Sequence, residues 1–177
     1  PKVSYVSSSR IRIHPNLYVG DPNHHYQGKV CLSSLNTWTG PKWSTIMTIG
    51  SILITIQSLL ESNPLKNEPG YESRSGEIFE IYNHIVEYDT MRQLIWRHSA
   101  ILGDWEDDVG IYEGFEGFNP IIKEHLVSHK DQLIHNIVTL TSKYPKDRLC
   151  ETGIYRMRVM ISYKPLCDRL ISLLNLI

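Results

Sequence analysis

The sequence predicts a mixed α+β protein, and three features of its 177 residues lead to this class. Residues 2–13 alternate and carry many β-branched side chains, which is typical of strands. Residues 14–47 contain frequent Gly and Pro, so they predict a long irregular loop, and loops of this length are usually functional. Apolar residues then recur at helical spacing from residue 49 onward. We therefore expect a small antiparallel sheet, a long functional loop, and helices packed across the sheet.

The elements of the N-terminal half follow from local patterns. Two strands are expected within residues 2–13, with a turn at Ser7 to Ser9. Thr48 is expected to cap a helix, and the buried stripe of that helix is expected to contain Ile49, Ile52, Leu53 and Ile56. A polar loop with two prolines and two glycines follows at 61–76, and a second helix is predicted over 77–98.

The C-terminal half is predicted to be helical. Asn119-Pro120 is typical of a helix start, and the periodicity continues that helix to about residue 141. A final helical stretch is predicted over 154–176, interrupted at Pro165. The expected organisation is a core at residues 1–102, an acidic Gly-rich linker or loop at 103–118, and a helical extension at 119–177 that covers part of the sheet.

Composition excludes several classes of function. The net charge is −1 and no basic stripe occurs, so no nucleic-acid partner is expected. No apolar run reaches the roughly 18 residues of a membrane span, so no membrane partner is expected. The three cysteines lack CxxC spacing, which argues against a disulfide framework and predicts a reduced compartment, cytoplasmic or nuclear.

No metal or small cofactor is expected either. His14, His24 and His25 have no fourth ligand at useful spacing. The acidic stretch beginning at Asp104 does not fit a calcium loop, because Val109 stands at the position that requires Gly and Phe115 at the position that requires Glu.

One ordered set of motifs carries the functional prediction: His14-Pro15-Asn16, then Cys31 within Gly28–Leu32, then Trp38 and Trp43, then the helix from Thr48. This set resembles the signature of ubiquitin-conjugating enzymes. Further segments are similar to the Z-type branch of that family, namely residues 37–44, 56–60, and 63–64 together with 67–72. Residues 82–95 and 119–141 resemble the helical extension of the same branch. The resemblance therefore covers most of the chain and implies the fold of that family, the UBC fold.

The resemblance implies a role for each motif residue. Cys31 would be the nucleophile that carries ubiquitin or a ubiquitin-like modifier as a thioester, and its place among glycines and polar loop residues makes exposure plausible. Asn16 would combine loop scaffolding with hydrogen-bond donation to the oxyanion. The loop after the first helix would supply a residue that positions the acceptor lysine, either Asn67 or Glu68. His14 and Pro15 would support the turn, and Trp38 and Trp43 would pack around the cysteine.

The implied partners are an activating enzyme, a ubiquitin ligase and protein substrates. The sequence also departs from the family pattern in three places. Asn16 and Cys31 are 31 − 16 = 15 residues apart, so residues 19–26 are expected to be an insertion that either loops out or moves Asn16. Thr45 replaces a Pro of the loop that often contacts the ligase. The first helix and first two strands of the family are absent, which is expected to expose an unpaired sheet edge and, if the chain is complete, to impair charging.

Other interpretations of these residues stay open. Free cysteines are usually buried, so Cys31 is a packing residue in the alternative view, and Cys150 and Cys167 have no catalytic context at all. Asn16 is also favoured in turns for purely conformational reasons. The alternative function is a non-catalytic UBC-fold module that binds ubiquitin or a partner. A cysteine protease is a third possibility, although no protease nucleophile motif surrounds Cys31.

Overall fold

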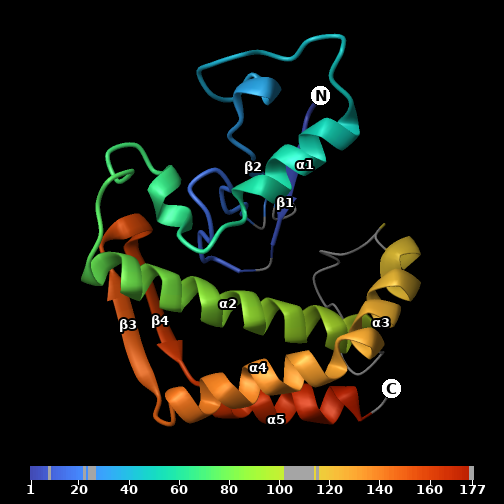
Figure 1. Ribbon diagram of the computed structural model, residues 1–177, viewed down its shortest axis with the longest axis vertical. Coiled ribbons are helices and arrows are strands. Elements are labelled where there is room, and N and C mark those ends of the chain that lie inside the picture. The colour runs from blue at the N-terminus through green and yellow to red at the C-terminus, as the bar shows by residue number, and fades with distance from the viewer. Residues whose placement is uncertain (8, 22, 24–26, 102–113, 115, 176–177) are drawn as a thin grey trace. The chain divides into compact units, whose positions relative to one another are not determined.

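The computed structural model describes residues 1–7, 9–21, 23, 27–101, 114 and 116–175 (Figure 1). The chain forms two compact units. The first contains Pro1–Val86 together with Thr152–Met157, and the second contains Glu87–Glu151 together with Arg158–Ile177. A short segment from late in the sequence therefore belongs to the N-terminal unit.

The first unit begins with a two-stranded antiparallel ribbon. Strand β1, Ser4–Val6, pairs with β2, Gln27–Lys29, so that Tyr5 lies opposite Gly28. The second strand predicted within residues 2–13 is wrong, because residues 10–13 are not in a strand. The carbonyl of Arg12 instead accepts a hydrogen bond from the Tyr82 hydroxyl at 2.8 Å, which ties this stretch to a helix rather than to a sheet.

Helix α1, Ile49–Leu59, begins where it was predicted. The Thr48 side chain accepts from the backbone N–H of Ser51 and the Ser51 side chain bonds back to the Thr48 N–H, which is a capping box. The predicted buried stripe is only partly correct, because Ile52 is buried whereas Ile49 and Leu53 are exposed. The core that α1 joins consists of Leu17, Val30, Leu32, Leu35 and Ile52.

Short 3₁₀ turns connect these elements at η2, Ser33–Leu35, and η3, Pro64–Asn67. Helix α2, Glu77–Ile101, confirms the helix predicted over 77–98. Glu77 and Glu80 lie in its first turn, where negative charge complements the helix dipole.

The second unit is mostly helical. The single helix predicted over 119–141 is observed as two, α3, Asn119–Ser128, and α4, Lys130–Lys143, because the backbone leaves helical geometry at His129. Helix α3 follows a 3₁₀ turn, η4, Glu116–Phe118. Helix α4 lies alongside α5, Tyr163–Leu174 (Figure 1).

The core of this unit contains an aromatic cluster. The Tyr163 ring stacks on Tyr144 with the ring centroids 5.6 Å apart. Tyr88 meets the same ring edge-on at 5.4 Å. Aromatic pairs at these separations add about 0.5–1.5 kcal/mol beyond the area that they bury.

The prediction of a helical stretch from 154 to 176 is wrong in its first part. A strand pair forms there instead, with β3, Arg148–Thr152, and β4, Met157–Ile161, joined by the turn η5, Ile154–Arg156. The predicted interruption at Pro165 is also absent. Pro165 lies in the first turn of α5, where its missing N–H has no intrahelical acceptor to lose.

The α+β class is confirmed. The division between the compact units falls within α2, after Val86, and not at residue 102, so the expected domain boundaries stay a prediction. Most of the expected linker lies outside the described residues. Within the described part of the chain, no helix combines the length and apolarity that a membrane crossing requires.

Candidate active site

A tight turn places the first of the predicted site residues. The backbone N–H of Leu17 donates to the His14 carbonyl at 3.0 Å, and the N–H of Asn16 donates to His14 Nδ1 at 3.0 Å. His14 is fully buried, and burial lowers its pKa below the usual 6.5 against opposing effects of the Glu61 charge and the Leu59 carbonyl. A buried neutral imidazole that accepts a backbone hydrogen bond acts here as a support for the turn.

Asn16 and Cys31 hold each other through two hydrogen bonds. The side-chain Nδ2 of Asn16 donates to the Cys31 carbonyl at 2.7 Å, and the Cys31 N–H donates to the Asn16 carbonyl at 2.8 Å. Next to them, the N–H of Tyr18 donates to the Lys29 carbonyl at 2.9 Å. The 14 residues between Asn16 and Cys31 therefore leave and return at one point held by these hydrogen bonds, and the expected insertion does not separate Asn16 from Cys31.

Cys31 lines a cavity of about 240 Å³. The sequence favoured an exposed thiol, but Cys31 is only 3% exposed, so that expectation is wrong. The reason is that Cys31 sits under the residues that surround the cavity, a set that includes Arg12, Pro15, Asn16, Tyr18, Trp38, Asn67, Glu68, Pro69 and Glu72. Cys31 therefore lines a small cavity together with two amide side chains and two carboxylates.

Arg12, which lines this cavity together with Tyr18, lies between two tyrosine rings. The guanidinium carbon lies 3.6 Å from the centre of the Tyr18 ring and 4.2 Å from that of the Tyr155 ring. Its Nη2 donates to the Pro15 carbonyl at 2.5 Å. Arg12 thus links a cation–π sandwich to the His-Pro-Asn turn, at a site where such contacts are worth roughly 0.5–2 kcal/mol each.

The two candidates for lysine positioning differ in their contacts. The Asn67 amide is engaged locally, because its Nδ2 donates to Glu61 Oε1 at 2.7 Å and to the Pro64 carbonyl at 3.2 Å. Glu68 is half-buried, and its Oε2 accepts a hydrogen bond from the Tyr155 hydroxyl. Both residues line the cavity, and Glu68 is the one that carries a charge into it.

The two tryptophans that were expected to pack around Cys31, Trp38 and Trp43, differ in their burial. Trp43 is partly buried and packs against the core of the first unit. Trp38 lines the cavity but is 52% exposed, so the expected packing role does not fit it. The loop after Cys31 is fastened by Thr37, whose Oγ1 accepts from the Leu32 N–H at 2.9 Å and donates to the Val30 carbonyl at 2.7 Å.

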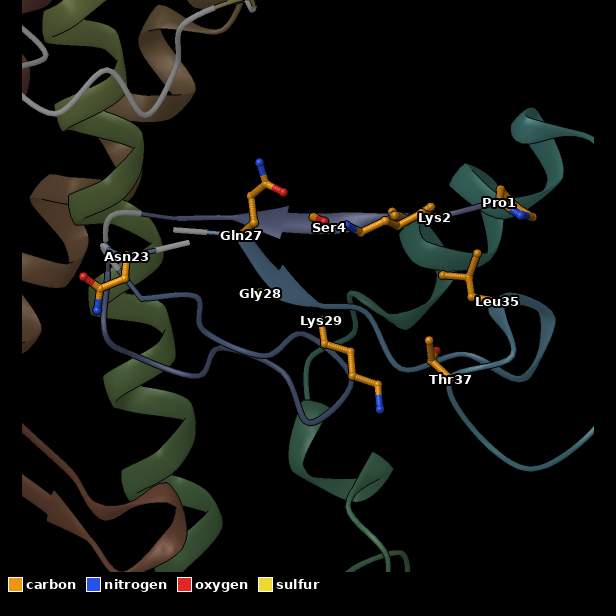
Figure 2. A pocket seen from close by; sticks show the side chains of 10 residues that line it. Pro1, Lys2, Ser4, Asn23, Gln27, Gly28, Lys29, Leu35 and Thr37 are labelled. Atoms are coloured by element: carbon orange, nitrogen blue, oxygen red, sulfur yellow. The ribbon is translucent and has the colours of Figure 1, made fainter. Parts of the chain in front are cut away.

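A larger hollow, of about 660 Å³, lies beside the β1–β2 ribbon (Figure 2). Lys2, Ser4, Gln27 and Lys29 line it, and none of its lining residues is a thiol, an imidazole or a carboxylate. The smaller cavity, which has a thiol and carboxylates in its lining, is therefore the better candidate for an active site. Among the described residues, no group of three or more His, Cys, Asp or Glu side chains can hold a metal ion, and His24 and His25 lie outside those residues.

Three contributors to the site were not predicted. Arg12 acts through a hydrogen bond and ring contacts, and Thr37 acts through hydrogen bonds. Neither set of contacts corresponds to a sequence motif. Tyr155 lies 87 residues after Glu68 in the chain and reaches it only through the fold.

Comparison with known proteins bears on this site directly. A family profile described as ubiquitin-conjugating enzyme matches residues 1–90, which include the motif residues, the cavity-lining loop and α1. The chain is 43% identical over 93 residues to the ubiquitin-conjugating enzyme E2 Z of Danio rerio, an alignment that covers 52% of this chain and 27% of that protein. It is 49% identical over 73 residues to the Homo sapiens protein of the same name, covering 41% and 21%.

A longer but weaker likeness extends past the profile. A probable ubiquitin-conjugating enzyme of Acanthamoeba polyphaga mimivirus is 30% identical over 175 residues, covering 93% of this chain and 10% of that protein. The chain therefore spans only about a tenth to a quarter of the length of these relatives. Because the profile covers more than half of the 177 residues, and because the residues it covers build the Cys31 cavity, the chain belongs to the ubiquitin-conjugating enzyme family.

Proposed function

We propose that this chain accepts ubiquitin or a ubiquitin-like modifier as a thioester on Cys31 and passes it to a lysine of a protein substrate or to a ubiquitin ligase. The observation that supports this is the clamp between Asn16 and Cys31 at the edge of a cavity that also holds Glu68. The modifier would arrive from an activating enzyme that uses ATP. We place this cycle in the cytoplasm or the nucleus.

The first step is exchange of one thioester for another. The Cys31 thiolate attacks the modifier's C-terminal carbonyl carbon, a new C–S bond forms, and the bond to the activating enzyme's sulfur breaks with release of that thiolate. Because only the thiolate attacks, the proton of the Cys31 thiol must leave first.

The second step is attack by a neutral lysine amine on the Cys31 thioester. The carbonyl oxygen gains negative charge, the C–S bond breaks, and the amine loses a proton as the amide forms. Asn16 Nδ2 would donate to this oxyanion, and for that it would have to give up its present hydrogen bond to the Cys31 carbonyl. Glu68 or Asn67 would orient the incoming amine, and no metal or small cofactor is required.

One observation favours a second function. Cys31 is 3% exposed, which suits a small packing residue as well as a nucleophile. In the alternative, the chain is a non-catalytic module that binds ubiquitin or a partner protein through the same fold. The two functions differ in whether Cys31 ever forms a covalent bond to the modifier.

A charging assay with two donors separates them. In the first arm, the chain is incubated with activating enzyme, ATP and ubiquitin. In the second arm, the donor is ubiquitin whose C-terminus is already a thioester to a small thiol, so that contact with the activating enzyme is not needed. Cys31→Ala is the test variant, and Cys150→Ala and Cys167→Ala are controls because both cysteines are also buried.

We expect a ubiquitin-sized adduct on a non-reducing gel in at least the second arm. It should disappear with thiol reductant, persist in both control variants and be absent in Cys31→Ala. The opposite result is a chain that is folded, as judged by circular dichroism, and that forms no such adduct with ubiquitin or other modifiers in either arm. That result would exclude the proposed enzymatic function. A measurable affinity for ubiquitin would then support the binding module.

A further inference from the structure

The turn between β3 and β4 belongs to the unit that holds Cys31. Thr152–Met157 joins Pro1–Val86, although the residues on both sides of it in the sequence belong to the other unit. Within this turn Tyr155 and Arg156 have φ values of 53° and 52°. A left-handed backbone is unfavourable for side chains of this size, so contacts around the turn must hold it in place.

Tyr155 supplies two of those contacts, and both lead to the cavity. Its hydroxyl donates to Glu68 Oε2, and its ring lies against the Arg12 guanidinium at 4.2 Å. Arg12 in turn donates to the Pro15 carbonyl of the turn that places Asn16. One side chain therefore touches both the carboxylate beside Cys31 and the support of the Asn16 turn.

The hydroxyl is suited to donate and not to act as a base. Burial raises the pKa of Tyr155 far above its usual value, and the hydrogen bond to Glu68 raises it further. The phenol is therefore protonated throughout the physiological range. Its proton fixes one carboxylate oxygen of Glu68 and leaves the other for a different partner.

We propose that Tyr155 is a positioning residue for lysine transfer, whose hydroxyl holds the Glu68 carboxylate at the Cys31 cavity while its ring steadies Arg12. This inference rests on the proposed function. Since Tyr155 lies beyond the residues that the family profile matches, the C-terminal part of the chain would complete a site built from the N-terminal part.

The test compares two ways of discharging the Cys31 thioester in a single turnover. Free lysine over a range of concentrations reports on orientation of an amine, whereas a small thiol removes ubiquitin without an amine to orient. The variants are Tyr155→Phe, which removes only the hydroxyl, and Tyr155→Leu, which also removes the ring from Arg12. Tyr71→Phe is the matched control, because Tyr71 lies in the same loop as Glu68 and does not line the cavity.

We expect Tyr155→Phe to be charged like the wild type and to react with the small thiol like the wild type. Its discharge to lysine should fall about tenfold in kcat/KM, the usual effect of losing a hydrogen bond to a charged group. In a Glu68→Ala background the same substitution should have no further effect. Tyr155→Leu should slow charging and both discharge reactions, and Tyr71→Phe should change none of them.

Two results would overturn this inference and leave the proposed function intact. One is an unchanged rate of lysine discharge in Tyr155→Phe. The other is an equal loss of rate with lysine and with the small thiol, which would mean that Tyr155 only stabilises the fold. A wild-type chain that cannot be charged in either arm would overturn the proposed function, and this inference with it.

Discussion

The hydrogen bonds of Asn16 combine two requirements that are difficult to separate in one side chain. Its Nδ2 holds the Cys31 carbonyl, yet an oxyanion would need the same donor. The Asn16 side-chain amide would then have to release the Cys31 carbonyl in order to donate to the oxyanion, so its structural role and its catalytic role use the same donor. An experiment can separate the two roles, because Thr37 holds the backbone on both sides of Cys31 and makes no hydrogen bond to Asn16 in these contacts.

Asn16→Ala should therefore slow lysine discharge far more than Thr37→Val. Loss of an oxyanion donor typically costs about 10²–10³-fold in rate, whereas loss of a purely structural hydrogen bond costs about 1–3 kcal/mol of folding free energy. Single-turnover discharge and urea unfolding of both variants measure the difference. Equal effects on rate in the two variants would mean that Asn16 is scaffold only.

His14 predicts a pH dependence of stability. Burial lowers its pKa in the folded chain, so the unfolded chain binds a proton more readily and protonation favours unfolding. The stability that neutral His14 provides is complete above pH 6.5 and is lost as the pH falls below that value, with a slope of at most about 1.4 kcal/mol per pH unit.

His14→Asn keeps a hydrogen-bond acceptor for the Asn16 N–H but cannot be protonated. The difference in unfolding free energy between wild type and this variant should narrow between pH 7.5 and pH 5, as measured by urea titration. The exposed His135→Asn variant serves as a control that retains the wild-type slope. If the difference in unfolding free energy between wild type and His14→Asn did not change with pH, His14 would not have a lowered pKa in the folded chain.

Among the secondary structure elements, strand β2 passes very close to the backbone of Tyr18. A Cβ added at Gly28 would lie 1.6 Å from the Tyr18 carbonyl oxygen, which is backbone and cannot rotate away. The same stretch carries the Tyr18–Lys29 hydrogen bond that closes the loop before Cys31.

Gly28→Ala should therefore destabilise the chain by about 3 kcal/mol or more, in the upper range of overpacking. Gly50→Ala is the matched control, because a Cβ there meets its nearest atom at 3.6 Å, in helix α1. Alanine is a better helix former than glycine, so this control should be neutral or slightly stabilising. Thermal unfolding of the two variants tests the contrast, and similar losses in both would refute it.

The sequence predicts most of the helices and the first strand, β1, but it does not predict β2, β3 or β4. Thr48 and the apolar spacing after it located α1 because capping and periodicity are local signals. Met157, Val159 and Ile161 alternate with Arg158 and Met160, a strand pattern obscured by the helical periodicity expected over 154–176. Leu53 was placed in the core because spacing gives the face of a helix but not how much of that face is covered.

The candidate site divides in the same way. Cys31 and the residues of the His-Pro-Asn turn stand in a recognisable motif, so the sequence could point to them. Arg12 and Tyr155 enter the site through a ring contact and through a hydrogen bond that spans 87 residues. Contacts of that sequence separation leave no periodic trace, and only the folded chain displays them.

The compact units of the chain differ in extent from the domains expected from its composition, which stay a prediction. The expected core ended at residue 102, but the compact unit around Cys31 also includes Thr152–Met157. Ile154 and Met157 are buried, so a chain that stops at residue 102 loses both side chains.

A chain of residues 1–102 should therefore be less stable than the 177-residue chain. Burial of two such side chains is worth about 3–6 kcal/mol, a large share of the roughly 5–15 kcal/mol that stabilises an ordinary domain. Denaturant unfolding with a probe in the first unit measures the loss. An unchanged midpoint would show that the segment is dispensable and would support the expected boundary.

The hydrogen bonds at the base of the 14-residue loop between Asn16 and Cys31 have a practical consequence. Its two ends are fastened by the Asn16–Cys31 and Tyr18–Lys29 hydrogen bonds, so the strain of a change between them need not reach the thiol. Extending a loop costs little, about 0.6 kcal/mol for each doubling of its length. An epitope or fluorophore inserted after Gly20 would thus place an internal reporter in the loop that leads to the proposed nucleophile, and both chain ends would stay free for immobilisation.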